Sequence, residues 1–306
     1  MSAVIIVLLS CFDFASGLLS PLIPIPLAVI VYRHYVKTGM AVAFVSAAAV
    51  ALITASPLTG VDVIITGLLG IALGLAVKER FSVTRIFIIG VGASVLAAVL
   101  RIFTFSLITG YSFIEDYTLQ WERISQYWLE VWQSGSLPVE TAEQLKAVAA
   151  SMPDLARMLL PMAVVGYSIL ETIVCLFGLK VALKRLGALL PPMPRFIHWR
   201  LPWYFVWGFI LSKAAAIILT YYPSEILKIL VLNVDLFFSG AFFIQGLAIM
   251  WFYMTQANIS KALRVLLTAV VFLTASIYVS FILIMLGVLD TWFDIRNLNK
   301  TGKGGY

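Results

Sequence analysis

The chain has 306 residues, of which 62% are hydrophobic and only 12% charged, and its formal net charge is +6. Soluble domains carry roughly 25% charged residues and about 45–50% apolar ones, so this chain could not cover a water-facing surface. The composition excludes a secreted disulfide scaffold, a cytosolic enzyme and a free nucleic-acid binder. It predicts an all-α polytopic membrane protein whose main partner is the lipid bilayer.

Apolar segments long enough to cross a bilayer recur along the chain, since a spanning helix needs roughly 20 such residues. The first, residues 3–32, is too long for one straight span and contains Pro21, Pro24 and Pro26, so we expect a span, a broken turn and a short second helix. The other expected spans are residues 40–56, 61–77, 86–110, 158–183, 203–221, 226–253 and 265–289. The total is nine spans, or eight if the first pair forms one kinked helix.

Residues 111–157 are predicted to form an external amphipathic insertion. One apolar face, with intervals of four, three, four and three, consists of Tyr117, Trp121, Ile124, Trp128 and Val131. A second short helix is expected over residues 139–150. The insertion either lies on the outer leaflet or acts as a lid, through Trp121 and Trp128, over an outward-facing cavity. The domain organisation is thus 1–110 and 158–289 as membrane helices, 111–157 as the insertion and 290–306 as a polar tail.

The basic residues indicate the orientation, because Lys and Arg favour the cytoplasmic ends of short loops. They gather on alternate loops, which we assign to the cytoplasm: Arg33, Lys37, Lys78, Arg80, Arg85, Lys184, Arg185, Arg195, Arg200, Lys261 and Arg264. Residues 111–157, on the opposite side, hold seven acids against three bases. The tail with Arg296, Lys300 and Lys303 would then lie outside, against the trend.

Small residues at four-residue spacing mark faces where helices approach closely in lipid. One such face consists of Ala43, Ala47, Ala51 and Ala55, and another of Gly70 and Gly74. They pack either against neighbouring helices of this chain or against a separate membrane partner subunit. The spacing alone does not decide between the two.

Charged residues inside the membrane are costly and mark functional candidates. Five such positions stand out: Asp13, Arg101, Glu171, Lys213 and Asp235. Lys213 and Asp235 lie at equal depth, roughly 14–15 Å, on helices joined by a short turn, so they can pair. Arg101 and Glu171 lie at about 15–20 Å and offer a second pair. Asp13 is left as the odd carboxylate, which motivates a hypothesis of proton or cation coupling.

The helix over residues 226–253 is unusually polar, with Asn233, Asp235, Ser239 and Gln245. We expect these side chains to line a ligand cavity. No catalytic residue, cofactor or metal site is expected, since the sequence has no Gly-rich phosphate loop, no His-Glu-x-x-His and no paired Cys motif. An ATPase would need a partner chain.

Several stretches resemble the YybS family of bacterial membrane proteins, a group with no assigned function. They are residues 21–33, 201–207, 246–253 and 287–296, the last reading Gly-Val-Leu-Asp-Thr-Trp-Phe-Asp-Ile-Arg. At a coarser level, residues 1–110 are similar to the substrate-binding components of energy-coupling-factor transporters, which capture a small molecule from outside and dock onto a partner subunit. The resemblance implies a multi-pass protein of the bacterial inner membrane, with a transporter-like, small-molecule-binding role. The alternatives are a membrane scaffold, like a rod-shape protein of similar architecture, and a stand-alone ion-coupled carrier.

Overall fold

The computed structural model describes residues 2–16, 19–134, 139–188, 190–192, 194–274 and 277–298, and over these residues the regular structure is helical without a strand. The all-α prediction is confirmed. The chain divides into two compact units, Met1–Pro192 and Met193–Tyr306, which we call the N-terminal and C-terminal units.

Five of the described helices are long and apolar enough to span a membrane. They are α3 (Val36–Thr54), α4 (Pro57–Lys78), α5 (Val83–Thr109), the greater part of α7 (Val139–Arg185) and α9 (Glu225–Gln256). Shorter apolar helices occur in α1 (Ser2–Ser16), in η1 (Ser20–Leu22) with α2 (Pro24–Arg33), in α8 (Phe205–Tyr221) and in α11 (Ile277–Phe293). A total of eight or nine spans stays a prediction.

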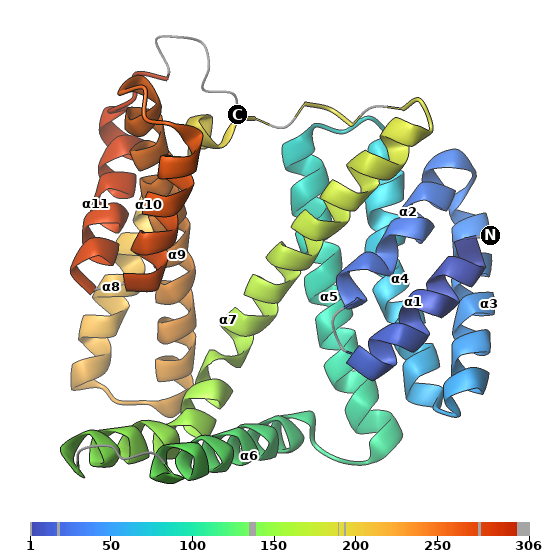
Figure 1. Ribbon diagram of the computed structural model, residues 1–306, viewed down its shortest axis with the longest axis horizontal. Coiled ribbons are helices and arrows are strands. Elements are labelled where there is room, and N and C mark those ends of the chain that lie inside the picture. Colours follow the sequence, from blue (N-terminus) through green and yellow to red (C-terminus); the bar gives the residue numbers. More distant parts are fainter. Residues whose placement is uncertain are drawn as a thin grey trace. The chain divides into compact units, whose positions relative to one another are not determined.

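Helix α4 is the central helix of the N-terminal unit, in contact with α2, α3 and α5 (Figure 1). Its glycines allow this packing: a Cβ atom on Gly70 would lie 2.5 Å from the carbonyl oxygen of Pro24, and one on Gly74 would lie 2.5 Å from that of Ala28. On the other side, a Cβ atom on Gly60 would lie 2.8 Å from the Cβ of Ala51.

The alanine face of α3 also packs inside the chain. Ala43 and Ala47 are buried, and Ala47 lies against Gly60 of α4. Ala55 is exposed and ends α3 in a left-handed conformation. The small-residue faces are therefore largely filled by neighbouring helices of the same chain, which was one of the two expected uses.

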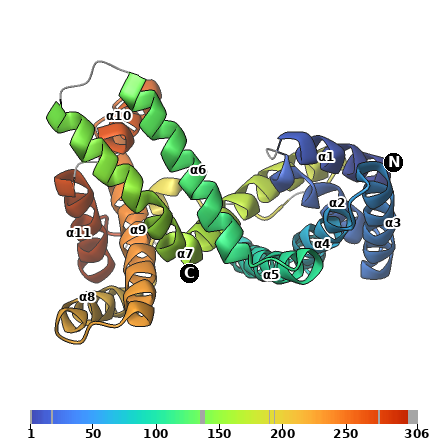
Figure 2. The ribbon, with the colours of Figure 1, turned by 90° about the horizontal axis from the view of Figure 1, so that it is seen from below.

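The predicted insertion has a different helical organisation from the one expected. Helix α6 (Phe113–Ser134) packs along the first part of α7, where the Ser125 hydroxyl donates to the carbonyl oxygen of Ala149 at 2.7 Å (Figure 2). The predicted helix over residues 139–150 and the predicted span 158–183 are both parts of α7, which continues through Pro153 and Pro161. A proline removes one backbone donor and can kink a helix without ending it.

In the C-terminal unit, α9 and α11 cross at two glycines. A Cβ atom on Gly246 would collide with the carbonyl group of Leu283, and one on Gly287 would collide with that of Phe242. A Cβ atom points toward the N-terminus of its own helix. The Cβ of Gly246 would meet the carbonyl four residues before Gly287, and the Cβ of Gly287 would meet the carbonyl four residues before Gly246. Each Cβ thus points toward the N-terminus of the other helix as well, so the two helices run parallel.

The prediction of a single span over residues 265–289 is wrong, because the chain forms α10 (Lys261–Thr274) and then α11 there. Near the end of α9, Thr255 accepts a hydrogen bond from Arg264 in the first turn of α10, and Tyr253 donates to the carbonyl oxygen of Ile295 beyond α11. Both ends of the α10–α11 pair therefore lie at the same end of α9. A helix parallel to α9 needs an intervening helix that runs back, and α10 is that helix.

The reversal changes the expected place of Arg296, whereas Lys300 and Lys303, the other basic residues of the predicted tail, lie outside the described residues. Arg296 contacts the backbone of Ile197 and Trp199, which belong to the loop whose charge assigns it to the cytoplasmic side. A single span over residues 265–289 would have placed Arg296 away from this loop, at the other end of α9.

A cysteine-labelling experiment tests this position of Arg296. In a chain with Cys11 and Cys175 replaced by serine, a membrane-impermeant maleimide added to spheroplasts should label Ser112→Cys but not Asn297→Cys. Both positions are exposed in the structure, and both should react after permeabilisation. Labelling of Asn297→Cys in intact spheroplasts would restore the single span.

Candidate ligand-binding cavity

An ion pair joins α4 and α5 in the N-terminal unit. Nε of Arg101 lies 2.5 Å from Oδ1 of Asp62, and Nη2 donates to the Thr66 hydroxyl at 2.8 Å. Thr66 follows Asp62 by four residues and so lies on the same face of α4. The Arg101 and Asp62 side chains are 32% and 35% exposed, so other groups can still approach them.

Asp62 was missing from the predicted intramembrane charges. It lies five residues, about 7.5 Å, from the start of α4, whereas Arg101 lies eight residues, about 12 Å, from the end of α5. The long arginine side chain bridges this difference. The prediction considered only charges near the bilayer midplane and therefore missed Asp62, which lies closer to the helix end. The sequence does indicate this position, because Asp62 and Thr66 are polar residues four apart in an otherwise apolar segment.

Asp13 is not an isolated carboxylate. Its Oδ1 atom accepts hydrogen bonds from the backbone N–H groups of Leu19 and Ser20, both at 2.7 Å. These residues lead into η1, where the chain turns between α1 and α2. A carboxylate that accepts backbone donors satisfies groups that the break in the helix leaves free.

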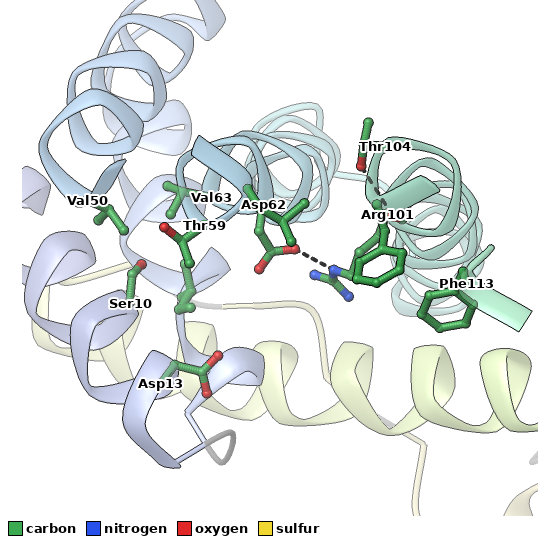
Figure 3. Close-up of a pocket in the computed structure, with 12 residues that line it drawn as sticks. Ser10, Asp13, Val50, Thr59, Asp62, Val63, Arg101, Thr104 and Phe113 are labelled. Atoms are coloured by element: carbon green, nitrogen blue, oxygen red, sulfur yellow. Dashed lines mark hydrogen bonds and ion pairs between the residues drawn. The ribbon is translucent and has the colours of Figure 1, made fainter. Parts of the chain in front are cut away.

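Asp13, Asp62 and Arg101 border one cavity of about 300 Å³. Figure 3 shows Asp62 and Arg101 pointing toward each other, with Ser10 and Asp13 on α1. The full lining consists of Ser10, Asp13, Ile23, Val50, Leu58, Thr59, Asp62, Val63, Arg101, Thr104, Phe105 and Phe113. The volume is at the lower end of the roughly 300–1,000 Å³ typical of small-molecule sites.

Ser10 supplies a second polar feature of the cavity. Its side chain is 7% exposed, and its hydroxyl oxygen has no hydrogen-bond partner within the described ranges of the chain. A buried hydroxyl without a partner costs free energy. The cavity therefore presents a polar group that a bound molecule could satisfy.

The aromatic contribution of α6 comes from its first residue. Phe113 lines the cavity and packs edge-on against Phe105, with ring centroids 5.7 Å apart. Neither Trp121 nor Trp128, the predicted lid residues, belongs to the lining. They lie further along α6, in ring contact with Tyr117 and with Tyr127 and Trp132 respectively.

Glu171 on α7 does not form the suggested pair with Arg101. It is 3% exposed and accepts a hydrogen bond from the hydroxyl of Ser94 on α5. Arg101 is engaged by Asp62 instead. Equal depth allowed the pairing, but only the relative positions of α4, α5 and α7 decide which carboxylate the guanidinium meets.

In the C-terminal unit, the expected contact between Lys213 and Asp235 is present. Nζ of Lys213 lies 2.8 Å from Oδ2 of Asp235, whose Oδ1 accepts from the Ser212 hydroxyl at 3.0 Å. Asn233 donates to the carbonyl oxygen of Ile229 on its own helix. Ser239 carries a buried hydroxyl with no hydrogen-bond partner in the described segments. A cavity lined by Asp235, Ser239 and Asn233 stays a prediction.

Gln245 belongs to a buried network between helices. Its Oε1 accepts the N–H of Leu201 at 2.9 Å, and its Nε2 donates to Asp290 and Thr291 at 3.1 and 3.0 Å. The Gln245 amide therefore joins α9 to α11. The prediction had placed this side chain in the wall of a cavity. The neighbouring face is also covered, since Gly246 packs on α11.

The centre of this network is an ion pair that the sequence patterns did not reveal. Nη2 of Arg296 lies 2.8 Å from Oδ2 of Asp290, and neither side chain has exposed area. The guanidinium also donates to the carbonyl oxygens of Ile197 and Trp199, each at 2.7 Å. Asp290, Arg296 and Leu298 are therefore buried. The polar tail over residues 290–306 stays a prediction, since residues 299–306 lie outside the described segments.

A model of the protein family described as "Predicted membrane protein (DUF2232)" matches residues 1–291 of the chain. No curated protein and no solved structure matches the chain.

Proposed function

Because the chain belongs to the DUF2232 family of predicted membrane proteins, and is therefore embedded in a lipid bilayer, we propose that it is a transporter-like module that binds a small molecule in the cavity of the N-terminal unit. It would act in the bacterial inner membrane together with partner subunits. The observation that carries the proposal is a cavity of about 300 Å³ bordered by Asp62, Arg101 and Ser10, whose hydroxyl has no hydrogen-bond partner among the described residues.

The position of the cavity along the helices supports capture from outside. Its lining includes residues near the start of α4, such as Leu58, and near the end of α5, such as Phe105. The distribution of basic residues assigns these helix ends to the outer side of the membrane. The proposal also agrees with the resemblance of residues 1–110 to the substrate-binding components of energy-coupling-factor transporters.

The scaffold alternative has less support. It required the Ala43 and Ala47 face for a partner, and that face packs against α4 in the same chain. A stand-alone ion-coupled carrier rested on an unpartnered Asp13, whose Oδ1 atom accepts two backbone hydrogen bonds. Kinship with the YybS family stays a prediction and would not by itself assign a function.

Native purification tests the proposed function. We expect a small molecule to co-purify with the wild-type chain in mild detergent and to be identified by mass spectrometry after denaturation. Thr104→Trp, which places an indole in the cavity, should remove that molecule. The control is Phe103→Trp, at the preceding residue, which is 64% exposed and absent from the lining; it should retain the molecule.

The proposal is wrong if no molecule is recovered from the wild type and the purified chain binds none of the small-molecule probes described below. It is also wrong if Thr104→Trp and Phe103→Trp retain equal amounts while both chains elute as monodisperse, folded protein.

A further inference from the structure

The ionisable residues of the cavity do not balance in charge. Its lining contains two carboxylates, Asp13 and Asp62, and one guanidinium, Arg101. With all three ionised, the lining carries one net negative charge. Charges interact far more strongly in a low-dielectric site than in water, so this imbalance favours a monovalent cation over a neutral molecule or an anion.

Among the described residues, each of the two carboxylates keeps one oxygen atom without a contact. Asp62 uses Oδ1 for Arg101, and Asp13 uses Oδ1 for the two backbone N–H groups. In the part of the chain that the structure describes, no donor contacts Oδ2 of either residue. An ammonium group has donors and no acceptor, and so it matches these two oxygens.

The rest of the lining suits the uncharged part of such a molecule. Phe105 and Phe113 present two aromatic rings, and Ile23 and Leu58 add aliphatic surface. Aromatic faces also attract cations electrostatically. The hydroxyl of Ser10 can accept one further hydrogen bond.

We propose that the cavity binds a small organic cation, an amine or a cationic heterocycle, with its charge beside Asp62 and Asp13 and its apolar part against Phe105 and Phe113. This inference rests on the proposed function, because it names the class of ligand for the same cavity.

Three probes of similar size and different charge test the class on the purified full-length chain. They are phenethylamine, which is cationic at pH 7, neutral 2-phenylethanol and anionic 3-phenylpropanoate. By equilibrium dialysis, the cation should bind at least about tenfold more tightly than either of the others, the size expected for one hydrogen bond to a charged group. Equal or tighter binding of the neutral or anionic probe would overturn the proposal.

Two variants on opposite sides of the ion pair give a sharper test. Asp62→Asn should weaken phenethylamine binding about tenfold or more, whereas Arg101→Gln, which removes the positive group, should retain or strengthen it. The control Glu79→Gln removes an exposed carboxylate from the opposite end of α4 and should change nothing. If Asp62→Asn and Arg101→Gln weaken binding equally, the pair serves only to position the helices and the cation proposal is wrong.

The identity of the co-purified molecule tests the ligand class independently of the proposed function. A co-purified molecule that is cationic and is displaced by Thr104→Trp supports both. A neutral or anionic molecule displaced by Thr104→Trp leaves the proposed function standing and overturns the ligand class. If no molecule co-purifies and none of the three probes binds, both are wrong.

Discussion

Asp290→Asn is expected to lower the free energy of unfolding by about 3–5 kcal/mol, the cost of removing one partner from a buried ion pair. The Arg296 guanidinium has no exposed area and would be left without a counter-charge. The same change weakens the contact with Gln245 on α9. Unfolding of the full chain in detergent micelles, followed by Trp fluorescence, would measure the loss.

Two further variants separate this effect from general fragility. Asp116→Asn alters a carboxylate near the surface whose hydrogen bond is to Gln120 of the same helix, and it should change stability by no more than about 0.5 kcal/mol. Asp290→Asn combined with Arg296→Gln should cost less than the sum of the two single changes. Strict additivity would show that the two side chains do not interact.

Gly246→Val should destabilise the C-terminal unit by at least the upper part of the range of about 1–3 kcal/mol that overpacking usually costs. Any Cβ atom on Gly246 meets the backbone of α11 at Leu283, and a backbone cannot move aside as a side chain can. The measurement is the same unfolding titration in detergent.

Gly240 provides the matched control, because it lies on the same helix and a Cβ atom there would have nothing within 4 Å. Gly240→Val should therefore retain nearly wild-type stability. Equal losses for the two variants would show that the α9–α11 crossing at Gly246 does not account for the effect.

The charge pairs show which contacts can be predicted from the sequence and which cannot. Lys213 and Asp235 lie on helices joined by one short turn, so counting residues from that turn places them together. The pair of Asp62 and Arg101 joins helices that are also neighbours in sequence, but at unequal depth. Here the length of the arginine side chain matters, and a comparison of depths alone pointed to Glu171 instead.

The network around Arg296 could not be predicted by the same means. Its contacts link the end of α11 to residues almost one hundred positions earlier, including Ile197. It also depends on α10 and α11 forming two helices where hydropathy indicated a single span. Hydropathy records how apolar a segment is, and it does not record where the chain reverses within it.

The spacing of the small residues predicts where helices pack closely, but not which helices. Their spacing correctly marks surfaces of close approach, at Gly70 and Gly74 for example, because only small side chains allow backbones to meet. It does not identify the helix that approaches. That partner is α2, whose position follows from the turn at η1 that Asp13 stabilises.

The parallel pairing of α9 and α11 has a consequence for biosynthesis. Helices α10 and α11 have 14 and 17 residues, each below the roughly 20 needed for independent insertion across a bilayer. Each helix would therefore depend on its contacts with α9 for stability. A nascent chain that ends before Asp290 already contains Leu283 and Gly287, so α9 and α11 could cross. The amide of Gln245 would still lack its partners Asp290 and Thr291, and that part of the buried network forms only once these two residues are made.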